Sequence, residues 1–259
     1  MNGNYEVIVI GAGSVGVPAA YYIAKAGLKV LVIDRYASVG QGANKAAIGG
    51  VRATHSDTAK IQIGLKSIEI LSRWQETHGD NIEWQTGGYT FVAYGPHEEK
   101  TLKGLLKIQH SYGLNIDWLD SDQLSQAVPA LKADGLLGGT FSPEDGSASP
   151  LLTLHAFYRQ ACLQGAEFRF GETVTAIPVT EGRITGVETD RGRYGAPMVI
   201  NAAGAHANQI SSLAGIESPV TPDAHEGGIT EPVARFLEPM VVDIRPRPGS
   251  SNFYFYQHH

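Results

Sequence analysis

The chain has 259 residues, of which 42% are hydrophobic, and its 20 basic against 26 acidic side chains give a net charge of −6. This length can bury a full core in two structural regions, and the acidic balance gives no general attraction to nucleic acid or an anionic membrane. One cysteine, Cys162, excludes an internal disulfide, and we expect it to be buried in a cytoplasmic protein. No run approaches the roughly 20 apolar residues of a membrane span, and no secretion signal is expected.

The first predicted element is a buried strand that leads directly into a glycine-rich turn. The apolar run Val7-Ile8-Val9-Ile10 is followed by Gly11-Ala12-Gly13-Ser14-Val15-Gly16 and then by an amphipathic helical segment. In such a turn Gly11 permits the sharp bend, Gly13 lets a phosphate approach the backbone, and Gly16 lets helix and strand pack closely. The pattern predicts a Rossmann-type dinucleotide site, with the pyrophosphate on free amides at the start of the helix.

A second predicted strand, residues 29–33, ends at Asp34. An acidic residue at this distance from the glycines lies beside the adenosine ribose, where it accepts hydrogen bonds from the hydroxyls. A carboxylate in this position argues against a cofactor with a 2′-phosphate on that ribose. The alternative, an ordinary strand-helix-strand unit without a ligand, is disfavoured by the combination of strand, glycines, helix and acid.

The middle of the chain combines a long loop with helices and a strand. Residues 35–52 are rich in Gly, Ala and small polar side chains, which favours a loop. Apolar spacing predicts helices over residues 58–78, 97–112 and 121–128, the last with Ser121 as its N-cap, and alternation predicts a strand over residues 88–93.

The later part of the chain returns to alternating elements. We expect a helix over 151–164, strands over 167–170, 174–178, 184–189 and 198–201, a small-residue turn over 202–206, and an aromatic strand over 252–256. The predicted fold is α/β. A Rossmann-type domain is assembled from residues 1–81 and 142–217, and a mixed-sheet α+β substrate domain comes from residues 82–141 and 218–259.

Four segments together resemble the D-amino acid oxidase and sarcosine oxidase family of flavoproteins, in particular its glycine oxidase, sarcosine oxidase and proline dehydrogenase β-subunit branch. They are the N-terminal fingerprint through Asp34-Arg35, the loop from Gly42-Ala43-Asn44 to Gly50-Val51-Arg52, the turn Pro143–Pro150, and Asn201–His206. The sequence departs from the family in two places, because relatives usually carry Ser at the position of Ala43 and Trp at that of His206.

The resemblance implies that the cofactor is FAD. Asp34 would bind the ribose, Arg35 would lie near the adenine, and Val174 would contact the adenine through its backbone. The complete set of implied cofactor residues is Gly11, Ala12, Gly13, Ser14, Val15, Gly16, Asp34, Arg35, Gly42, Ala43, Asn44, Gly49, Gly50, Val174, Ala203 and Gly204.

Three residues are candidates for the reaction. Arg52 matches an arginine that helps to bind the substrate carboxylate in monomeric sarcosine oxidases, and a guanidinium offers a rigid, permanently charged fork for that purpose. Lys45 falls where some relatives place a basic residue over the flavin, and His55 follows Arg52 closely. The alternatives are a solvent-facing arginine, a solvated lysine and a structural histidine. Scattered histidines make a metal site improbable.

The resemblance implies oxidation of a small amino acid or secondary amine of the glycine, sarcosine or proline type. In this family flavin N5 takes a hydride from the carbon that bears the amine, and the resulting imine is hydrolysed. Oxygen or an electron-accepting partner would reoxidise the flavin. An alternative on the same scaffold is oxidation of a 2-hydroxy acid or glycerol 3-phosphate, because fold alone does not settle function.

A third hypothesis concerns the C-terminal end. Relatives continue for roughly another domain's worth of core, so this sequence is predicted to be truncated at the C-terminus. It would then be a flavin-binding subunit without activity of its own, or another subunit would complete the fold.

Overall fold

A computed structural model describes residues 3–224, 226–250 and 252–258. The chain forms two compact units, Met1–Ile48 with Pro150–Gly228 and Gly49–Ser149 with Ile229–His259. The predicted domains place residues 49–81 and 142–149 with the nucleotide region, whereas their contacts place them in the second unit. Which part serves the cofactor and which the substrate stays a prediction.

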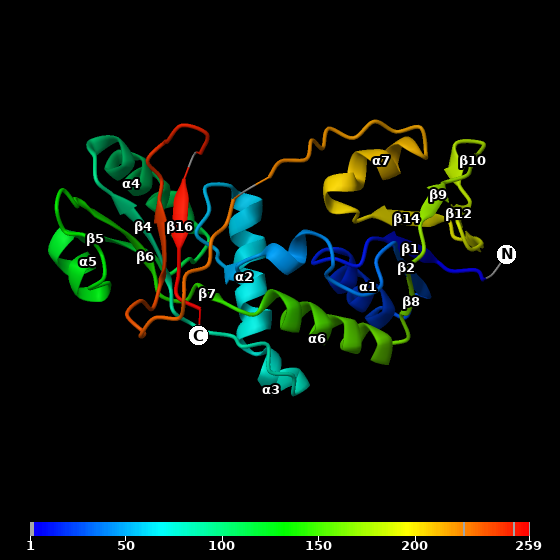
Figure 1. The fold of residues 1–259 in the computed structure, drawn as a ribbon, viewed down its shortest axis with the longest axis horizontal. Coiled ribbons are helices and arrows are strands. Elements are labelled where there is room, and N and C mark those ends of the chain that lie inside the picture. The colour runs from blue at the N-terminus through cyan, green and yellow to red at the C-terminus, as the bar shows by residue number, and fades with distance from the viewer. Residues whose placement is uncertain (1–2, 225, 251, 259) are drawn as a thin grey trace. The chain divides into compact units, whose positions relative to one another are not determined.

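The first unit is built on a parallel sheet of four strands in the order β14-β1-β2-β8 (Figure 1). These strands are β1 Val7–Ile10, β2 Val30–Asp34, β8 Glu167–Phe170 and β14 Met198–Asn201. All three pairings are parallel, as expected for strands joined by helical crossovers. The Rossmann-type sheet predicted from the sequence is confirmed.

Both faces of this sheet are covered. The α1 helix, Gly16–Lys25, packs against β1, β2 and the α6 helix, Pro150–Leu163. On the other face, Ile8 and Ile33 belong to a core cluster that also includes Val187 and Tyr194 from an antiparallel sheet. This double coverage explains why β1 and β2 are continuous apolar runs.

Shorter elements complete the first unit. They are η1 Ala43–Ala46, β9 Val174–Ala176, β10 Val179–Thr180, β11 Arg183–Ile184, β12 Gly186–Thr189, β13 Arg193–Gly195, η2 Gly204–His206 and α7 Ala207–Ser212. Cys162 is exposed rather than buried. It lies on α6, whose buried side chains include Leu154, Phe157 and Ala161.

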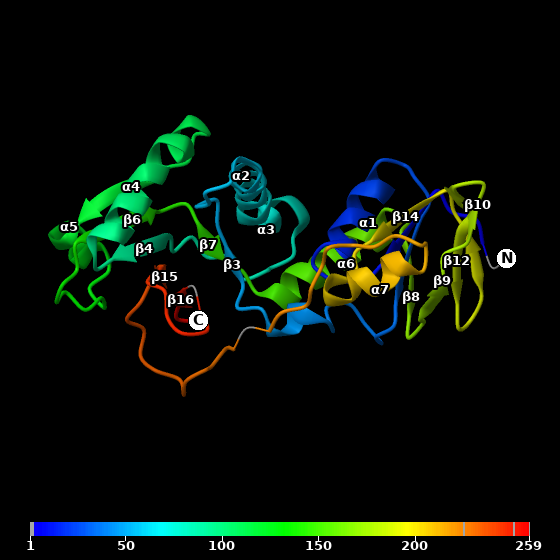
Figure 2. The ribbon, with the colours of Figure 1, turned by 90° about the horizontal axis from the view of Figure 1, so that it is seen from above.

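The second unit contains a mixed sheet in the order β16-β15-β4-β6-β5 (Figures 1 and 2). Its strands are β4 Tyr89–Ala93, β5 Asp117–Asp120, β6 Gly138–Ser142, β15 Met240–Asp243 and β16 Phe253–Phe255. Only the β15–β4 pair is parallel among these four pairings. This mixed sheet agrees with the α+β character predicted for the second region.

Four helices and a small antiparallel ladder accompany this sheet. They are α2 Thr58–Ser72, α3 Trp74–His78, α4 Pro96–Ser111, α5 Ser121–Ala127 and the ladder of β3 Gly50–Val51 with β7 Gly146–Ser147. The single helix predicted over 58–78 is therefore interrupted at Arg73. Asp120, not Ser121, is the N-cap of α5. Within the described residues, no helix is long and apolar enough to cross a membrane.

Candidate cofactor and substrate sites

The glycine-rich turn after β1 is closely packed at two glycines and open at the third. A Cβ atom added to Gly16 would lie 1.9 Å from the Gly11 carbonyl oxygen, and one added to Gly11 would lie 2.4 Å from the Ala202 carbonyl oxygen. Gly11 also has a φ of +110°, which favours glycine. A Cβ added to Gly13 would meet no protein atom within 4 Å. The turn therefore leaves open space where a phosphate is expected.

The start of α1 offers amide hydrogens to this space. Val15 caps the helix without a side-chain hydrogen bond, and no acidic residue lies in the first turn. Within the described part of the chain, the amides of Gly13, Ser14, Val15 and Gly16 donate no hydrogen bond. Unpaired amides at a helix N-terminus favour an anion.

Asp34 lies at the end of β2 beside the same turn. Its carboxylate accepts hydrogen bonds from the Ala12 amide at 2.6 Å and from the Tyr36 amide at 2.8 Å. A carboxylate has about four acceptor sites, so these two bonds fix its orientation and leave capacity for ribose hydroxyls.

Arg35 forms a polar cluster that sequence reasoning missed. Its guanidinium donates to the Tyr36 hydroxyl at 3.0 Å and lies 2.8 Å from the Nε2 atom of His206. His206 Nδ1 lies 3.1 Å from the Gln209 side-chain oxygen. His206, where relatives usually carry Trp, thus contacts the residue predicted to lie near the adenine.

The remaining predicted cofactor residues of the first unit lie in short elements and loops around the sheet. Asn44, in η1 with Ala43, donates to the Pro150 carbonyl at 3.1 Å, and this bond ties the Gly42–Asn44 loop to α6. The Ala203 amide donates to the Asn201 side chain at 3.2 Å, just before Gly204. Val174 is buried at the start of β9, and the Lys45 side chain is exposed.

Gly49, Gly50, Arg52 and His55 all belong to the second unit. A Cβ added to Gly50 would lie 1.8 Å from the Tyr89 hydroxyl, so a larger residue there would require the Tyr89 side chain to shift. Burial raises the pKa of the Tyr89 hydroxyl above its usual range. Tyr89 is therefore neutral and keeps a hydrogen-bond donor.

Arg52 is fixed in place rather than directed freely into solvent. Its Nη1 atom donates to the Thr54 carbonyl at 2.6 Å, and its guanidinium lies over the rings of Tyr89 and Phe91, at 5.8 and 5.1 Å from their centroids. Among the described residues, no carboxylate forms an ion pair with it. A guanidinium has five N–H donors, so most of them are available to an external carboxylate.

His55 is half-buried close to Arg52 and carries the features of a neutral imidazole. Burial lowers the pKa of His55 from 6.5, and the positive charges of Arg52 and Lys60 act in the same direction. The His55 carbonyl accepts a hydrogen bond from the Gln109 side chain at 3.1 Å. The residue is thus tied to α4 through its backbone.

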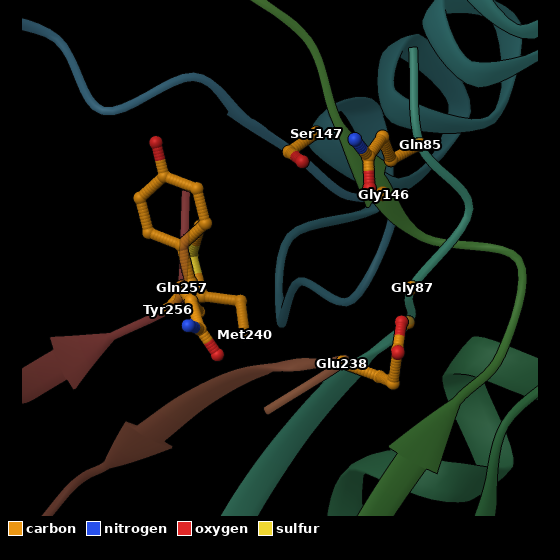
Figure 3. Close-up of a pocket in the computed structure, with 9 residues that line it drawn as sticks. Gln85, Gly87, Gly146, Ser147, Glu238, Met240, Tyr256 and Gln257 are labelled. Atoms are coloured by element: carbon orange, nitrogen blue, oxygen red, sulfur yellow. The ribbon is translucent and has the colours of Figure 1, made fainter. Parts of the chain in front are cut away.

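Two adjoining pockets lie in the second unit. Figure 3 shows Gln85 and Ser147 on one side of the first pocket and Met240 and Tyr256 on another. The second pocket has a volume of about 220 Å³ and shares Gln85, Ser147 and Tyr256 with the first. Met240 would also be 2.8 Å from a Cβ added to Gly50, so the first pocket adjoins the strand that leads to Arg52.

Sequence reasoning also missed Asp145 as a functional candidate. Its side chain is fully buried and accepts hydrogen bonds from the Ala53 amide and the Thr54 hydroxyl. Asp145 lies in the Pro143–Pro150 turn, which contributed to the family resemblance, but no local pattern links it with residues so far away along the chain. Within the described residues, no group of three or more His, Cys, Asp or Glu side chains is arranged to hold a metal.

Comparison with known proteins gives matches along most of the chain. Mouse (Mus musculus) mitochondrial sarcosine dehydrogenase is 26% identical over 87% of this chain, and the β subunit of sarcosine oxidase from Rhodobacter capsulatus is 22% identical over 92%. The chain spans only 25% and 59% of the lengths of these two relatives.

A solved structure has the same fold. The L-proline dehydrogenase of P. horikoshii matches with a TM-score of 0.85 and 28% sequence identity over 94% of this chain and 65% of the dehydrogenase. The family model described as FAD dependent oxidoreductase, DAO, matches residues 6–258. The open turn at Gly13, its unpaired amides and the adjacent carboxylate of Asp34 fit the diphosphate and ribose of FAD. The chain therefore belongs to the DAO family of FAD dependent oxidoreductases.

Proposed function

We propose that the protein oxidises a small amino acid or secondary amine of the glycine, sarcosine or proline type. The observation that carries this proposal is Arg52, whose guanidinium is fixed by Thr54 and two aromatic rings and has no carboxylate partner within the described part of the chain. Relatives named for sarcosine and proline act on substrates that carry a carboxylate next to an amine. Arg52 is suited to bind that carboxylate in a bidentate manner.

The cofactor residues proposed for this chain are those around the glycine-rich turn, Asp34 and the later loops. Bound FAD supplies the acceptor for a hydride from the carbon next to the amine. The amides at the start of α1 bind the diphosphate, and the Asp34 carboxylate binds the ribose. Arg52 holds the substrate carboxylate and thereby limits the orientations of the carbon to be oxidised.

Two further residues, His55 and Lys45, are proposed to contribute to the same site. His55, with its lowered pKa, adds no positive charge near neutral pH. Lys45 is exposed and is proposed to act on the electrostatics of the cofactor or on oxygen.

The names of the relatives include both dehydrogenases and oxidases, so oxygen or an electron-accepting partner receives the electrons. An oxygen-consumption assay distinguishes the two. A cytoplasmic location is part of the same proposal, supported by the single cysteine.

The test is anaerobic reduction of the FAD-loaded chain by glycine, sarcosine, proline and hydroxyproline. We expect at least one of them to bleach the flavin absorbance near 450 nm, a property of the flavin itself. Bleaching by 2-hydroxyglutarate or glycerol 3-phosphate, with no response to any amine, would replace this proposal by the hydroxy-acid alternative.

A second candidate function is a flavin-binding subunit that needs another chain for activity. The observation that favours it is length, because the chain covers 25% to 65% of the relatives described above, and one of these relatives is itself a named subunit. Mass measurement of the assembly purified from its source tests it. A second chain in that assembly, together with a chain that binds FAD but oxidises no amine when it is alone, would support this candidate.

A further inference from the structure

The carboxylate of Asp145 is the most deeply buried acidic group near Arg52. The residue has 0% exposure, and its two oxygens accept hydrogen bonds from the Ala53 amide at 2.8 Å and the Thr54 hydroxyl at 2.6 Å. Thr54 is itself buried, with 5% exposure. A buried carboxylate is costly without such partners, so this group needs both bonds to be accommodated.

Asp145 also connects the segment around Arg52 to the mixed sheet of the second unit. Its backbone carbonyl accepts a hydrogen bond from the Gly88 amide at 2.8 Å, directly before β4. On its other side, β3 and β7 pair through Gly50 with Ser147. The strand before Arg52 and the two residues after it are thus both fastened to the turn that carries Asp145.

Arg52 lies between these two points of attachment. Its guanidinium donates to the carbonyl of Thr54, the residue whose hydroxyl is bound by Asp145. The same guanidinium lies over two aromatic rings of β4, the strand that follows Gly88. Loss of the Asp145 bonds would release the Thr54 carbonyl and with it one of the contacts that fix the guanidinium.

Among the ion pairs of the described residues, none joins the Asp145 carboxylate with the Arg52 guanidinium, so the carboxylate leaves the N–H donors of the guanidinium available. Burial raises the pKa of the Asp145 carboxyl above its usual value, and the hydrogen bonds from Ala53 and Thr54 and the positive charge of Arg52 oppose this rise. Asp145 therefore fixes Arg52 without competing for its donors.

We propose that Asp145 is a positioning residue for Arg52, which it holds, through Ala53 and Thr54, in the orientation that binds the carboxylate of the substrate. This inference rests on the proposed function. It differs from a purely structural role, because a positioning residue determines how strongly the enzyme distinguishes an amine with a carboxylate from the same amine without one.

The test compares proline with pyrrolidine, or sarcosine with dimethylamine, on the FAD-loaded full chain. In Asp145→Ala we expect KM for the carboxylate-bearing substrate to rise roughly 10- to 100-fold, as for a binding group displaced by about 1 Å. The rate with pyrrolidine is expected to change little. Arg52→Ala serves as the reference for complete loss of discrimination.

Conservative variants separate geometry from charge. Asn at position 145 can accept from the Ala53 amide through its oxygen and donate to the Thr54 hydroxyl oxygen, so Asp145→Asn is expected to keep most of the discrimination. Thr54→Val removes only the hydroxyl and is expected to raise KM, whereas Thr54→Ser keeps it. If Asp145→Ala fails to fold, the Thr54 pair provides the same test.

A matched control comes from another buried acid of the same unit. Asp243 has 6% exposure and binds Arg245 through both carboxylate oxygens. Asp243→Ala is expected to lower stability without changing the ratio of kcat/KM for proline and pyrrolidine. A direct readout is binding of cyclopentanecarboxylate, followed by the shift in flavin absorbance, which requires no turnover.

The outcomes are distinguishable. If the wild type discriminates and Arg52→Ala does not, while Asp145→Ala and Thr54→Val behave as wild type, the inference is overturned and the proposed function stands. An equal loss of discrimination in Asp243→Ala also overturns the inference, since the effect would follow from destabilisation. If the wild type oxidises no amine and binds no carboxylate, both proposals fail.

Discussion

At the scale of single residues, Gly13 and Gly16 have different tasks although both belong to one turn. A Cβ atom at Gly13 would meet no protein atom within 4 Å. We predict that Gly13→Ala folds with nearly unchanged stability but binds FAD about 100-fold more weakly, a loss of ~2.7 kcal/mol, because the methyl group takes the space of a phosphate. Equilibrium dialysis with FAD and thermal unfolding of the apoprotein measure the two effects separately.

Two other glycines provide the controls for this prediction. Gly16→Ala would place a Cβ 1.9 Å from a backbone oxygen and is expected to destabilise the apoprotein by about 1–3 kcal/mol. Gly104, exposed within α4, has no atom within 4 Å of an added Cβ, so Gly104→Ala is expected to leave FAD affinity unchanged. Unchanged FAD affinity in Gly13→Ala would show that no phosphate lies at this point.

The sequence predicts those site residues whose contacts are with residues nearby in the sequence. The glycines and Asp34 follow one another within a single strand-turn-helix-strand unit, so spacing alone places the carboxylate beside the turn. Asp145 could not be found in this way, because its hydrogen-bond partner Ala53 is 92 positions away. The contact of Arg35 with His206, 171 positions away, is equally invisible to local spacing.

At the scale of elements, the start of α5 shows that hydrogen bonding, and not residue preference alone, decides which residue is the N-cap. Both Asp120 and Ser121 are good N-cap residues, but only the Asp120 carboxylate accepts from the Gln123 amide, at 2.9 Å, while Gln123 accepts from the Asp120 amide. We predict that Asp120→Ala lowers the free energy of unfolding by about 1 kcal/mol. Ser121→Ala is expected to change it by less than ~0.5 kcal/mol.

Urea denaturation of the two variants checks this prediction under identical FAD loading. A larger loss of stability for Ser121→Ala than for Asp120→Ala would contradict the cap assignment. Equal and negligible effects would show that the end of α5 frays in solution and that the capping box contributes nothing measurable.

Among the strands that sequence reasoning missed, β6 is formed by pairing rather than favoured by its composition. The β6 segment begins with two glycines, which are unfavourable in strands, yet it lies between β4 and β5 and bonds to both. The Gly139 position is closely packed, since an added Cβ would lie 2.4 Å from the Phe91 oxygen. Close strand packing explains why glycine is used there.

At the scale of the whole molecule, both compact units are discontinuous in sequence. The α6 helix begins at Pro150, and the helix and its following strand return the chain to the first sheet. Periodicity predicts these elements and their order. It does not give the boundary, because a residue belongs to a unit through contacts with segments that are distant in sequence.

Hydrogen exchange measured with and without FAD tests which parts of the two units bind the cofactor. Ligand that binds only the folded state stabilises it by about 2.7 kcal/mol at 100 times its Kd, so FAD is expected to slow exchange where it binds. We predict protection of peptides that contain residues 11–16, 34–36, 42–44 and 203–204 in the first unit. The α5 helix of the second unit should exchange at the same rate with and without FAD.

The peptide with residues 49–52 decides how far the cofactor region extends. Its contacts assign it to the second unit, whereas the family resemblance implies that Gly49 and Gly50 contact FAD. Protection of this peptide in wild type, lost in Gly13→Ala at an FAD concentration that saturates only the wild type, would show that cofactor contacts extend beyond the first unit. Protection that persists in Gly13→Ala would arise from something other than diphosphate binding, and the assignment of Gly49 and Gly50 would then be wrong.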